Sequence, residues 1–335
     1  TGGTFQIGGG TGATNTYAVT ADFSALANFT VNLGPTGTFR VGDANSNTSG
    51  SPASSSTLIL ASTSASITAG TINLGQGTGQ GAADQALKLG AGTNELNADI
   101  INIGGNTTRS GGSLEFAGST GSVVIRGSDG VGAADVNMVN GNIGTGIANQ
   151  TDFLLAGHSA DVLIDTMVMA AKSSTSGATT ANFTFDQGTL DIAALSMTNS
   201  TGSYSGVATS NVTLGGGTTT IDALTMAANT SSGAGTANAN LDVTGGTVTI
   251  GSGSGTAINM ANAGTARTVN STIDITGGTL NVTGDIVRTG GAGTENATIT
   301  LNGGTVDLNG NDLGSSTAAI VFNAHGESGL AAAGI

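Results

Sequence analysis

The chain has 335 residues, with 58 Gly, 2 Pro, no Cys and no Trp, and a formal charge of −14 at pH 7. Its seven Lys and Arg residues are scattered singly, which argues against nucleic-acid binding, and the lack of Cys excludes a disulfide scaffold. No apolar run approaches the ~20 residues that span a bilayer, so we predict no membrane span. Only 8% of residues are charged, but 37% are hydrophobic and many alternate with polar residues, which favours ordered β-structure over disorder.

Short Gly-anchored units recur through the first third of the chain. Each has Gly, then Thr or Ser, then an apolar–x–apolar triplet, which is typical of a turn that leads into a strand. The four units are GGTFQI (residues 2–7), TGTFRV (36–41), AGTINL (69–74) and GGSLEF (111–116). We interpret all four as loose copies of the repeat that follows later in the chain.

Other segments depart from this pattern. We expect residues 1–33 to form an N-terminal cap or an irregular first coil, in which residues 18–26 form a short helix or part of that coil. Residues 91–105 predict a short extra coil or a lateral loop. The dense apolar run of residues 161–169, DVLIDTMVM, predicts a strand buried on both faces or an inserted element.

One ten-residue pattern occurs five times between residues 183 and 308. Alternating apolar residues on each side of a Gly-containing turn predict two strands joined by a sharp corner. A β-hairpin and a corner of a parallel β-solenoid both satisfy this local pattern. The copies are FTFDQGTLDI, VTLGGGTTTI, LDVTGGTVTI, IDITGGTLNV and ITLNGGTVDL, which begin at Phe183, Val212, Leu241, Ile273 and Ile299.

Five of the six Met residues recur at one phase of the repeat, before loops rich in Ser, Thr, Gly and Asn. They are Met138, Met169, Met197, Met226 and Met260, with steps of 31, 28, 29 and 34 residues. This spacing favours the solenoid, with about three short strands per coil of roughly 29 residues and the Met side chains in one interior column. A metal-binding or partner-binding Met surface is the less favoured reading, because soft-metal sites usually combine Met with Cys or His.

We therefore predict an all-β fold, a parallel β-solenoid (β-helix) that forms a single continuous domain over residues 1–335. The repeats are most regular over residues 183–308, and residues 317–335 form an irregular C-terminal end. A solenoid of this length needs no division into domains, because each coil contacts only its neighbours.

No catalytic or cofactor-binding residue is predicted, and the metal-binding residues are unknown. GHSAD, at residues 157–161, brings His158, Ser159 and Asp161 together in sequence. A nucleophile elbow requires Gly at position 161, so we interpret this segment as a polar turn. Weak Ca²⁺ binding stays a hypothesis, because one Asp occurs in each of four repeats, although not at one register. These residues are Asp186, Asp242, Asp274 and Asp307.

Two further activities are less favoured. A polysaccharide-degrading enzyme needs paired carboxylates and usually aromatic sugar platforms, whereas Trp is absent and Tyr occurs only at Tyr17 and Tyr204. Ice binding through flat Thr rows is suggested by Thr218–Thr220 and by Thr247 with Thr249. The equivalent positions in later repeats become residues 280–281 (Leu-Asn) and 306–307 (Val-Asp), which breaks such a lattice.

The GGTLNVTG unit at residues 277–284, with its relatives over residues 188–308, resembles the autotransporter-associated β-strand repeat. The resemblance implies a passenger-like secreted bacterial surface protein that is extracellular or located at the cell surface. We expect a non-enzymatic structural rod in a surface layer, fibre or adhesin stalk, which self-assembles through the solenoid ends or sides. An adhesin whose variable loops bind a surface glycan or a host or cell-surface ligand is the alternative, and a polysaccharide-degrading β-helix enzyme ranks third.

Overall fold

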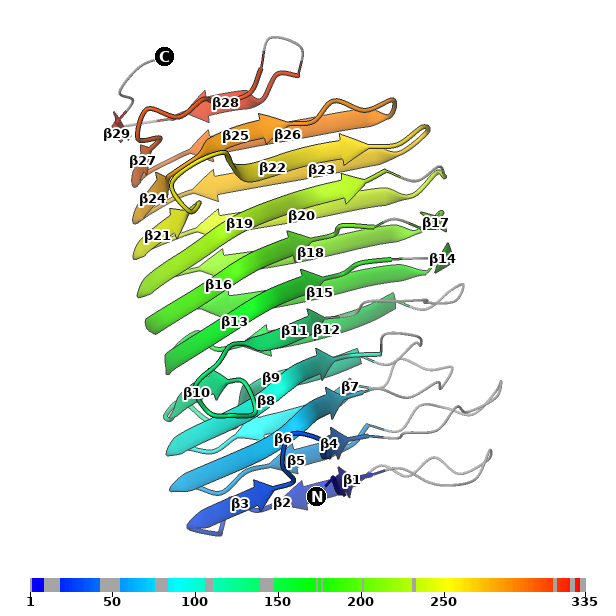
Figure 1. The fold of residues 1–335 in the computed structure, drawn as a ribbon, viewed down its shortest axis with the longest axis vertical. Helices are drawn as coiled ribbons and strands as arrows, with labels where there is room; N and C mark the ends of the chain where they lie inside the picture. The colour runs from blue at the N-terminus through cyan, green and yellow to red at the C-terminus, as the bar shows by residue number, and fades with distance from the viewer. Residues whose placement is uncertain are drawn as a thin grey trace.

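The computed structural model describes residues 2–8, 19–42, 55–75, 84–105, 111–138, 148–172, 174–175, 177–200, 202–230, 233–315, 318–325 and 329–331. These residues contain no helix and form the predicted parallel β-solenoid, whose strands stack along the long axis of the molecule (Figure 1). Val212 pairs with Leu241, 29 residues later, which is the repeat length that the sequence indicates.

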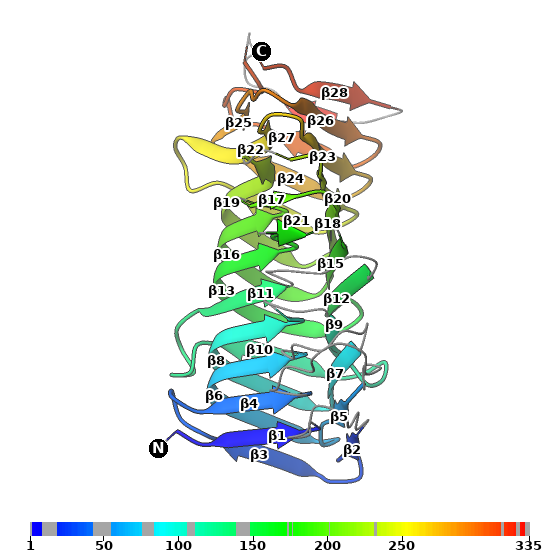
Figure 2. The same ribbon diagram turned by 90° about the vertical axis from the view of Figure 1, so that its right-hand side faces the viewer.

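Two long sheets make up the walls of the solenoid, and Figure 2 shows them on opposite sides of the stack. Sheet A has 16 strands. They are β1 (Thr4–Ile7), β3 (Asn28–Asn32), β4 (Thr38–Val41), β6 (Ser64–Leu74), β8 (Thr93–Ile103), β10 (Ser122–Arg126), β11 (Ala134–Met138), β13 (Ser159–Met169), β16 (Gly188–Met197), β19 (Thr218–Asn229), β21 (Thr247–Ile250), β22 (Thr256–Ala263), β24 (Thr279–Val282), β25 (Asp285–Arg288), β27 (Thr305–Asp307) and β29 (Gly329–Ala331).

Sheet B has 11 strands, and a third sheet has two. Sheet B consists of β2 (Thr20–Asp22), β5 (Thr57–Ile59), β7 (Asp84–Leu89), β9 (Gly111–Phe116), β12 (Ala148–Leu154), β15 (Ala178–Phe185), β18 (Val207–Leu214), β20 (Thr236–Val243), β23 (Thr268–Ile275), β26 (Thr294–Leu301) and β28 (Val321–Ala324). The short third sheet pairs β14 (Ser174–Thr175) with β17 (Ser203–Tyr204).

A coil follows one path, which β18 and β19 illustrate. The chain leaves β18 in sheet B through a Gly-rich turn, residues 215–217, which we call the first corner. It enters sheet A, bends at the exposed pair Asp222 and Ala223 (the second corner), and continues to Met226. The loop that follows Met226 returns to sheet B and is the third corner. The predicted three segments per coil are therefore present, although the last two form one bent strand here and separate strands in the β21–β22 coil.

The Met residues form the predicted interior column. Met138, Met169, Met197, Met226 and Met260 are successive register partners in sheet A, and none exposes any surface. Because each Met meets another Met one rung away, the flexible thioether side chains fill the same part of the core in these five coils. Apolar residues from sheet B, such as Phe183 and Leu241, are buried against them.

We predicted that the four Gly-anchored units of the first third are copies of the later repeat. This prediction was wrong in register, because none of the four units stacks in line with the strand that follows the first corner of that repeat. β1, β4 and the end of β6 stack on the segment that leads to the Met column, not on the strand after the first corner. The fourth unit, GGSLEF, is β9 and lies in sheet B. A Gly that frees the backbone for a turn occurs at more than one corner, so the short motif does not distinguish them.

Three other expectations need correction. Residues 93–103 form β8, an ordinary sheet A strand between β6 and β10, so residues 91–105 are neither an extra coil nor a lateral loop. β13 alternates between buried and exposed residues and bends at Asp165 and Thr166, so it is not buried on both faces. Residues 19–26 form a strand and a turn without a helix, whereas residue 18 lies outside the described residues.

Candidate functional site

The third corner, whose variable loops the adhesin alternative assigns to ligand binding, starts from a left-handed backbone residue in successive coils. In the N-terminal coils this residue is Gly, at Gly8, Gly42, Gly75 and Gly104. From β13 onward it carries a side chain, at Ala170, Thr198, Ala227 and Ala261, with φ between 47° and 53°. A left-handed conformation costs a residue with a Cβ roughly 1–2 kcal/mol, so packing and hydrogen bonds around the corner must offset that strain.

Two buried Ser hydroxyls of sheet B stabilise this turn. Ser271 Oγ accepts a hydrogen bond from Ala261 N at 3.0 Å and donates one to Met226 O at 3.0 Å. Two coils earlier in the same column of sheet B, Ser210 Oγ accepts a hydrogen bond of 2.7 Å from Thr198 Oγ1. Backbone polar groups at the start of the corner are thus satisfied inside the protein, which gives this part of the loop a structural role.

Tyr204 is buried, with only 3% of its surface exposed. Lys172 Nζ lies 5.3 Å and Arg267 Cζ 4.2 Å from the centre of its ring. Arg267 Nη1 also donates a hydrogen bond to Tyr204 O at 2.8 Å, and Asn229 Nδ2 donates one to Tyr204 Oη at 2.9 Å. This cluster joins third corners of different coils. Tyr17 lies outside the described residues.

Burial changes the proton affinity of the groups in this cluster. The pKa of Lys172 falls from 10.5 to about 8, because burial disfavours the charged amine. Burial likewise raises the pKa of the Tyr204 hydroxyl and lowers the pKa of Arg267. Lys172 Nζ donates a hydrogen bond to Gly177 O, so the amine of Lys172 faces the backbone of the same third corner.

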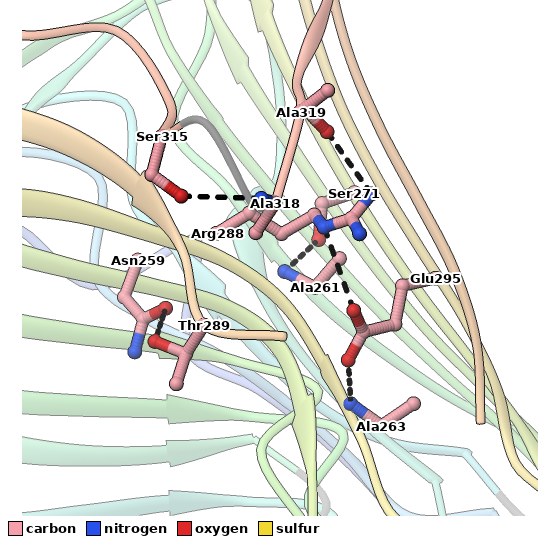
Figure 3. A network of polar contacts seen from close by, with 10 residues as sticks. All are labelled: Asn259, Ala261, Ala263, Ser271, Arg288, Thr289, Glu295, Ser315, Ala318 and Ala319. Carbon is pink, nitrogen blue, oxygen red and sulfur yellow. Dashed lines mark hydrogen bonds and ion pairs between the residues drawn. The ribbon is translucent and has the colours of Figure 1, made fainter. Parts of the chain in front are cut away.

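An ion pair replaces apolar packing where the Met column ends. Arg288 is the register partner of Met260, and its Nε lies 3.4 Å from Glu295 Oε2 (Figure 3). The side chain of Glu295 is 4% exposed, and its Oε1 accepts a hydrogen bond from Ala263 N at 2.8 Å. Arg288 Nη1 also donates to Ala319 O at 3.0 Å. These contacts tie the last coils together around a buried carboxylate.

The side chains of GHSAD point in different directions. The ring of His158 stacks on Phe116, with centroids 3.7 Å apart and 9° between the planes. Asp161 Oδ2 pairs with Arg126 Nη2 at 2.6 Å, and its Oδ1 accepts a hydrogen bond of 2.8 Å from Thr189 Oγ1. The His and Asp side chains therefore do not form the hydrogen-bonded relay that a Ser hydrolase uses.

The four repeat Asp residues occupy three different places. Gly157 N donates one bifurcated hydrogen bond to both carboxylate oxygens of Asp186, at 2.8 Å each, and Asp307 is a register partner of a sheet A residue. Asp242 and Asp274 are different, because they are direct register partners on β20 and β23, half-buried on the outward face of sheet B. Burial and the neighbouring carboxylate of Asp274 raise the pKa of Asp242.

A hollow of about 390 Å³ adjoins this carboxylate pair, and its lining comes from three successive coils. One row belongs to the sheet B strands, and the other consists of exposed residues at the first corners. The lining residues are Asp242, Asp274 and Thr300 in the first row and Thr244, Thr276 and Asn302 in the second. All six carry oxygen atoms that can accept hydrogen bonds.

Beside the hollow, the outward face of sheet B carries two columns of uncharged polar side chains from β15 to β26. The first is Thr180, Thr209, Asn238, Asn270 and Asn296, and the second is Asn182, Asn211, Asn240, Thr272 and Thr298. The Asn side chains form ladders along the axis: Asn211 Nδ2 donates to Asn182 Oδ1 at 2.8 Å, and Asn270 Nδ2 donates to Asn238 Oδ1 at 2.7 Å.

Sheet A carries one unbroken Thr column, which the sequence comparison missed. It consists of Thr189, Thr218, Thr247, Thr279 and Thr305. Thr218 therefore aligns with Thr279 and Thr305, one residue earlier than the positions compared in the sequence, whereas the position of Thr220 was compared correctly with residues 281 and 307. The adjacent outward column still mixes Asp, Thr and Asn, so it does not extend the Thr row into a flat lattice.

Comparisons with models of known protein families, with curated proteins and with solved structures gave no match. Within the part of the chain that the structure describes, no helix is long and apolar enough to cross a membrane. The same residues contain no group of three or more His, Cys, Asp or Glu side chains placed to hold a metal ion. The hollow beside Asp242 and Asp274 and the adjoining Asn/Thr columns are therefore the candidate site.

Proposed function

We propose that this chain is the structural rod of a secreted, passenger-like surface protein, within a surface layer, fibre or adhesin stalk. The observation that carries the proposal is the continuous parallel ladder of sheet B from β2 to β28. In such a stack each coil passes backbone hydrogen bonds to the next coil along the axis. A force that pulls two neighbouring coils apart is then resisted by many backbone hydrogen bonds at once, which suits a stiff extracellular spacer.

The placement of the basic residues supports a role in a protease-rich environment. Lys172 and Arg267 are each only 1% exposed, and Lys88 and Arg126 are held in ion pairs on their strands. A trypsin-like protease must extract several residues around a Lys or Arg before it can cut. Extraction requires local unfolding, which these paired strands oppose.

Self-assembly is part of the same proposal. The last strand of a solenoid presents backbone N–H and C=O groups to a further strand, so copies can join end to end, and regular sides also allow lateral association. Electron microscopy of the chain at several concentrations tests this directly. Filaments or sheets would support assembly, dispersed rods would restrict the proposal to a stalk segment, and compact globules would refute the rod.

Limited proteolysis provides the second test. We expect the folded chain to survive trypsin under native conditions much longer than the same chain unfolded in urea, and mass spectrometry to place early cuts outside the paired strands. Digestion at the rate of the unfolded chain, with early cuts after Lys88 and Arg126, which lie within strands, would contradict a protease-resistant rod.

A further inference from the structure

We propose that the outward face of sheet B, from β15 to β26, binds a neutral, polyhydroxylated polymer such as a glycan chain that lies along the solenoid axis. The hollow beside Asp242 and Asp274 would hold one part of this ligand, and the Asn/Thr columns would contact its length. The inference goes beyond the rod function and does not depend on it, because a stalk, fibre or layer protein could each carry such a face.

The Asn ladders leave hydrogen-bonding capacity free for a ligand. An Asn amide has two N–H donors and an oxygen with two lone pairs. Asn211 donates to Asn182 at 2.8 Å and accepts from Asn240 at 2.9 Å, which uses one N–H and one lone pair. The second donor and second lone pair remain available on a half-exposed face. Parallel strands repeat this arrangement every ~4.8 Å, which suits a polymer whose hydroxyls also repeat along its length.

The hollow adds strong acceptors at one edge of these columns. An ionised carboxylate only accepts hydrogen bonds, and a bond from a hydroxyl to a carboxylate is stronger than one between neutral groups. The raised pKa of Asp242 has two causes, burial and the charge of Asp274, and no hydrogen bond lowers it. Its carboxylate is thus free to accept from ligand hydroxyls. The volume of about 390 Å³ lies within the ~300–1,000 Å³ range of small-ligand sites.

Charge favours a neutral ligand over an anionic one. The chain carries a formal charge of −14, and the two columns beside the hollow contain only Asn and Thr. An anionic glycan would meet Asp242 and Asp274 with no cation in these columns to offset the repulsion. A Ca²⁺ ion needs six to eight oxygen ligands, and its binding would not engage the Asn columns. These columns also lack aromatic side chains, so affinity would come from many hydrogen bonds along the rod.

The test uses the full chain and isothermal titration calorimetry with neutral hexasaccharides of glucose, mannose and galactose, a hexasaccharide of a uronic acid, and CaCl₂. Two variants probe the face: Asp242→Asn with Asp274→Asn, and Thr300→Val. Asp191→Asn is the matched control, because Asp191 is an exposed carboxylate on the outward face of sheet A. Circular dichroism establishes that each variant keeps its β-structure.

We expect at least one neutral hexasaccharide to bind, and the double Asp variant to weaken this binding by about tenfold or more, since hydrogen bonds to a charged group are stronger than those between neutral groups. Asp191→Asn should bind like the wild type, and the uronic acid hexasaccharide should not bind. The proposal is overturned if no neutral hexasaccharide binds, if binding survives in the double variant, or if CaCl₂ alone binds at the Asp pair. None of these results bears on protease resistance, so the rod function is judged separately.

Discussion

Changing Asp274 to Asn removes one of two like charges that β20 and β23 hold in register. Neighbouring strands lie ~4.8 Å apart, and two unit charges at that separation repel by about 0.9 kcal/mol in water and about 3.5 kcal/mol at an effective dielectric constant near 20. Both side chains are half-exposed, so solvent screening places the effect near the lower figure. We expect Asp274→Asn to raise the free energy of unfolding by about 1 kcal/mol at neutral pH.

The pH dependence makes this prediction specific. Because the pKa of Asp242 is raised above 3.8 in the folded chain, the folded state binds a proton more readily than the unfolded state. The free energy of unfolding of the wild type should therefore increase as the pH falls through that raised pKa toward 3.8. Asp274→Asn removes one cause of the raised pKa and should show a smaller increase. The two proteins should therefore converge in stability in acid.

Urea unfolding followed by circular dichroism measures the overall change, and hydrogen exchange of the β20 and β23 amides shows whether it is local. Asp191→Asn serves as the control, because the rung partners of Asp191 are Leu163 and Thr220, neither of which is charged. An equal gain in the control, or a gain for Asp274→Asn that persists below the ordinary pKa of Asp, would refute the reasoning.

Three further changes test the core and the corners by the same urea unfolding assay. Met197→Ala should lower the free energy of unfolding by about 2–5 kcal/mol through a cavity in the Met column, and Met197→Leu by less than about 1.5 kcal/mol; equal losses would argue against a packed column. Gly246→Ala should destabilise by more than about 1 kcal/mol, because φ is +71° and the new Cβ would lie 2.6 Å from Gly216 C, whereas Gly253→Ala, also at positive φ but in open space, should cost less. Lys172→Met should raise the free energy of unfolding by up to about 3 kcal/mol below pH 8, because it removes a buried charged amine. This gain in stability should shrink as the pH rises from about 8 to 10.5, where the Lys of the unfolded chain also loses its proton. A gain independent of pH would exclude burial of the charged amine as its cause.

The solenoid could be predicted because its two strongest signals are periodic and long. Met residues at a constant phase and alternating apolar residues around a Gly corner are satisfied together only when equivalent strands stack. The register of the first third could not be predicted in the same way. Thr38 and Thr247 both follow a Gly and both begin strands. The strand of Thr38 stacks on the segment that ends in the Met column, whereas the strand of Thr247 comes directly after the first corner.

The sequence identified the Asp residues of the candidate site but did not predict that two of them are aligned. Asp242 and Asp274 each appear once per repeat, but their 32-residue spacing includes extra residues between Ile250 and Ile258, at the second corner. No local pattern reports where such extra residues are accommodated. The burial of Tyr204 could not be predicted from the sequence for a similar reason. Its partner Arg267 is 63 residues away in the sequence, and the contact exists only because the coils stack.

The left-handed residue that opens the third corner in eight described coils also marks equivalent points along the chain. Thr198 and Ala227 hold the same left-handed backbone conformation 29 residues apart, and the Met residues that they follow, at 197 and 226, are register partners in the column. A gene duplication or deletion with breakpoints at two such residues would add or remove one whole coil and join chain ends that already match in direction. Recombination at this corner can therefore lengthen or shorten the molecule in steps of one coil without creating a new junction in its core.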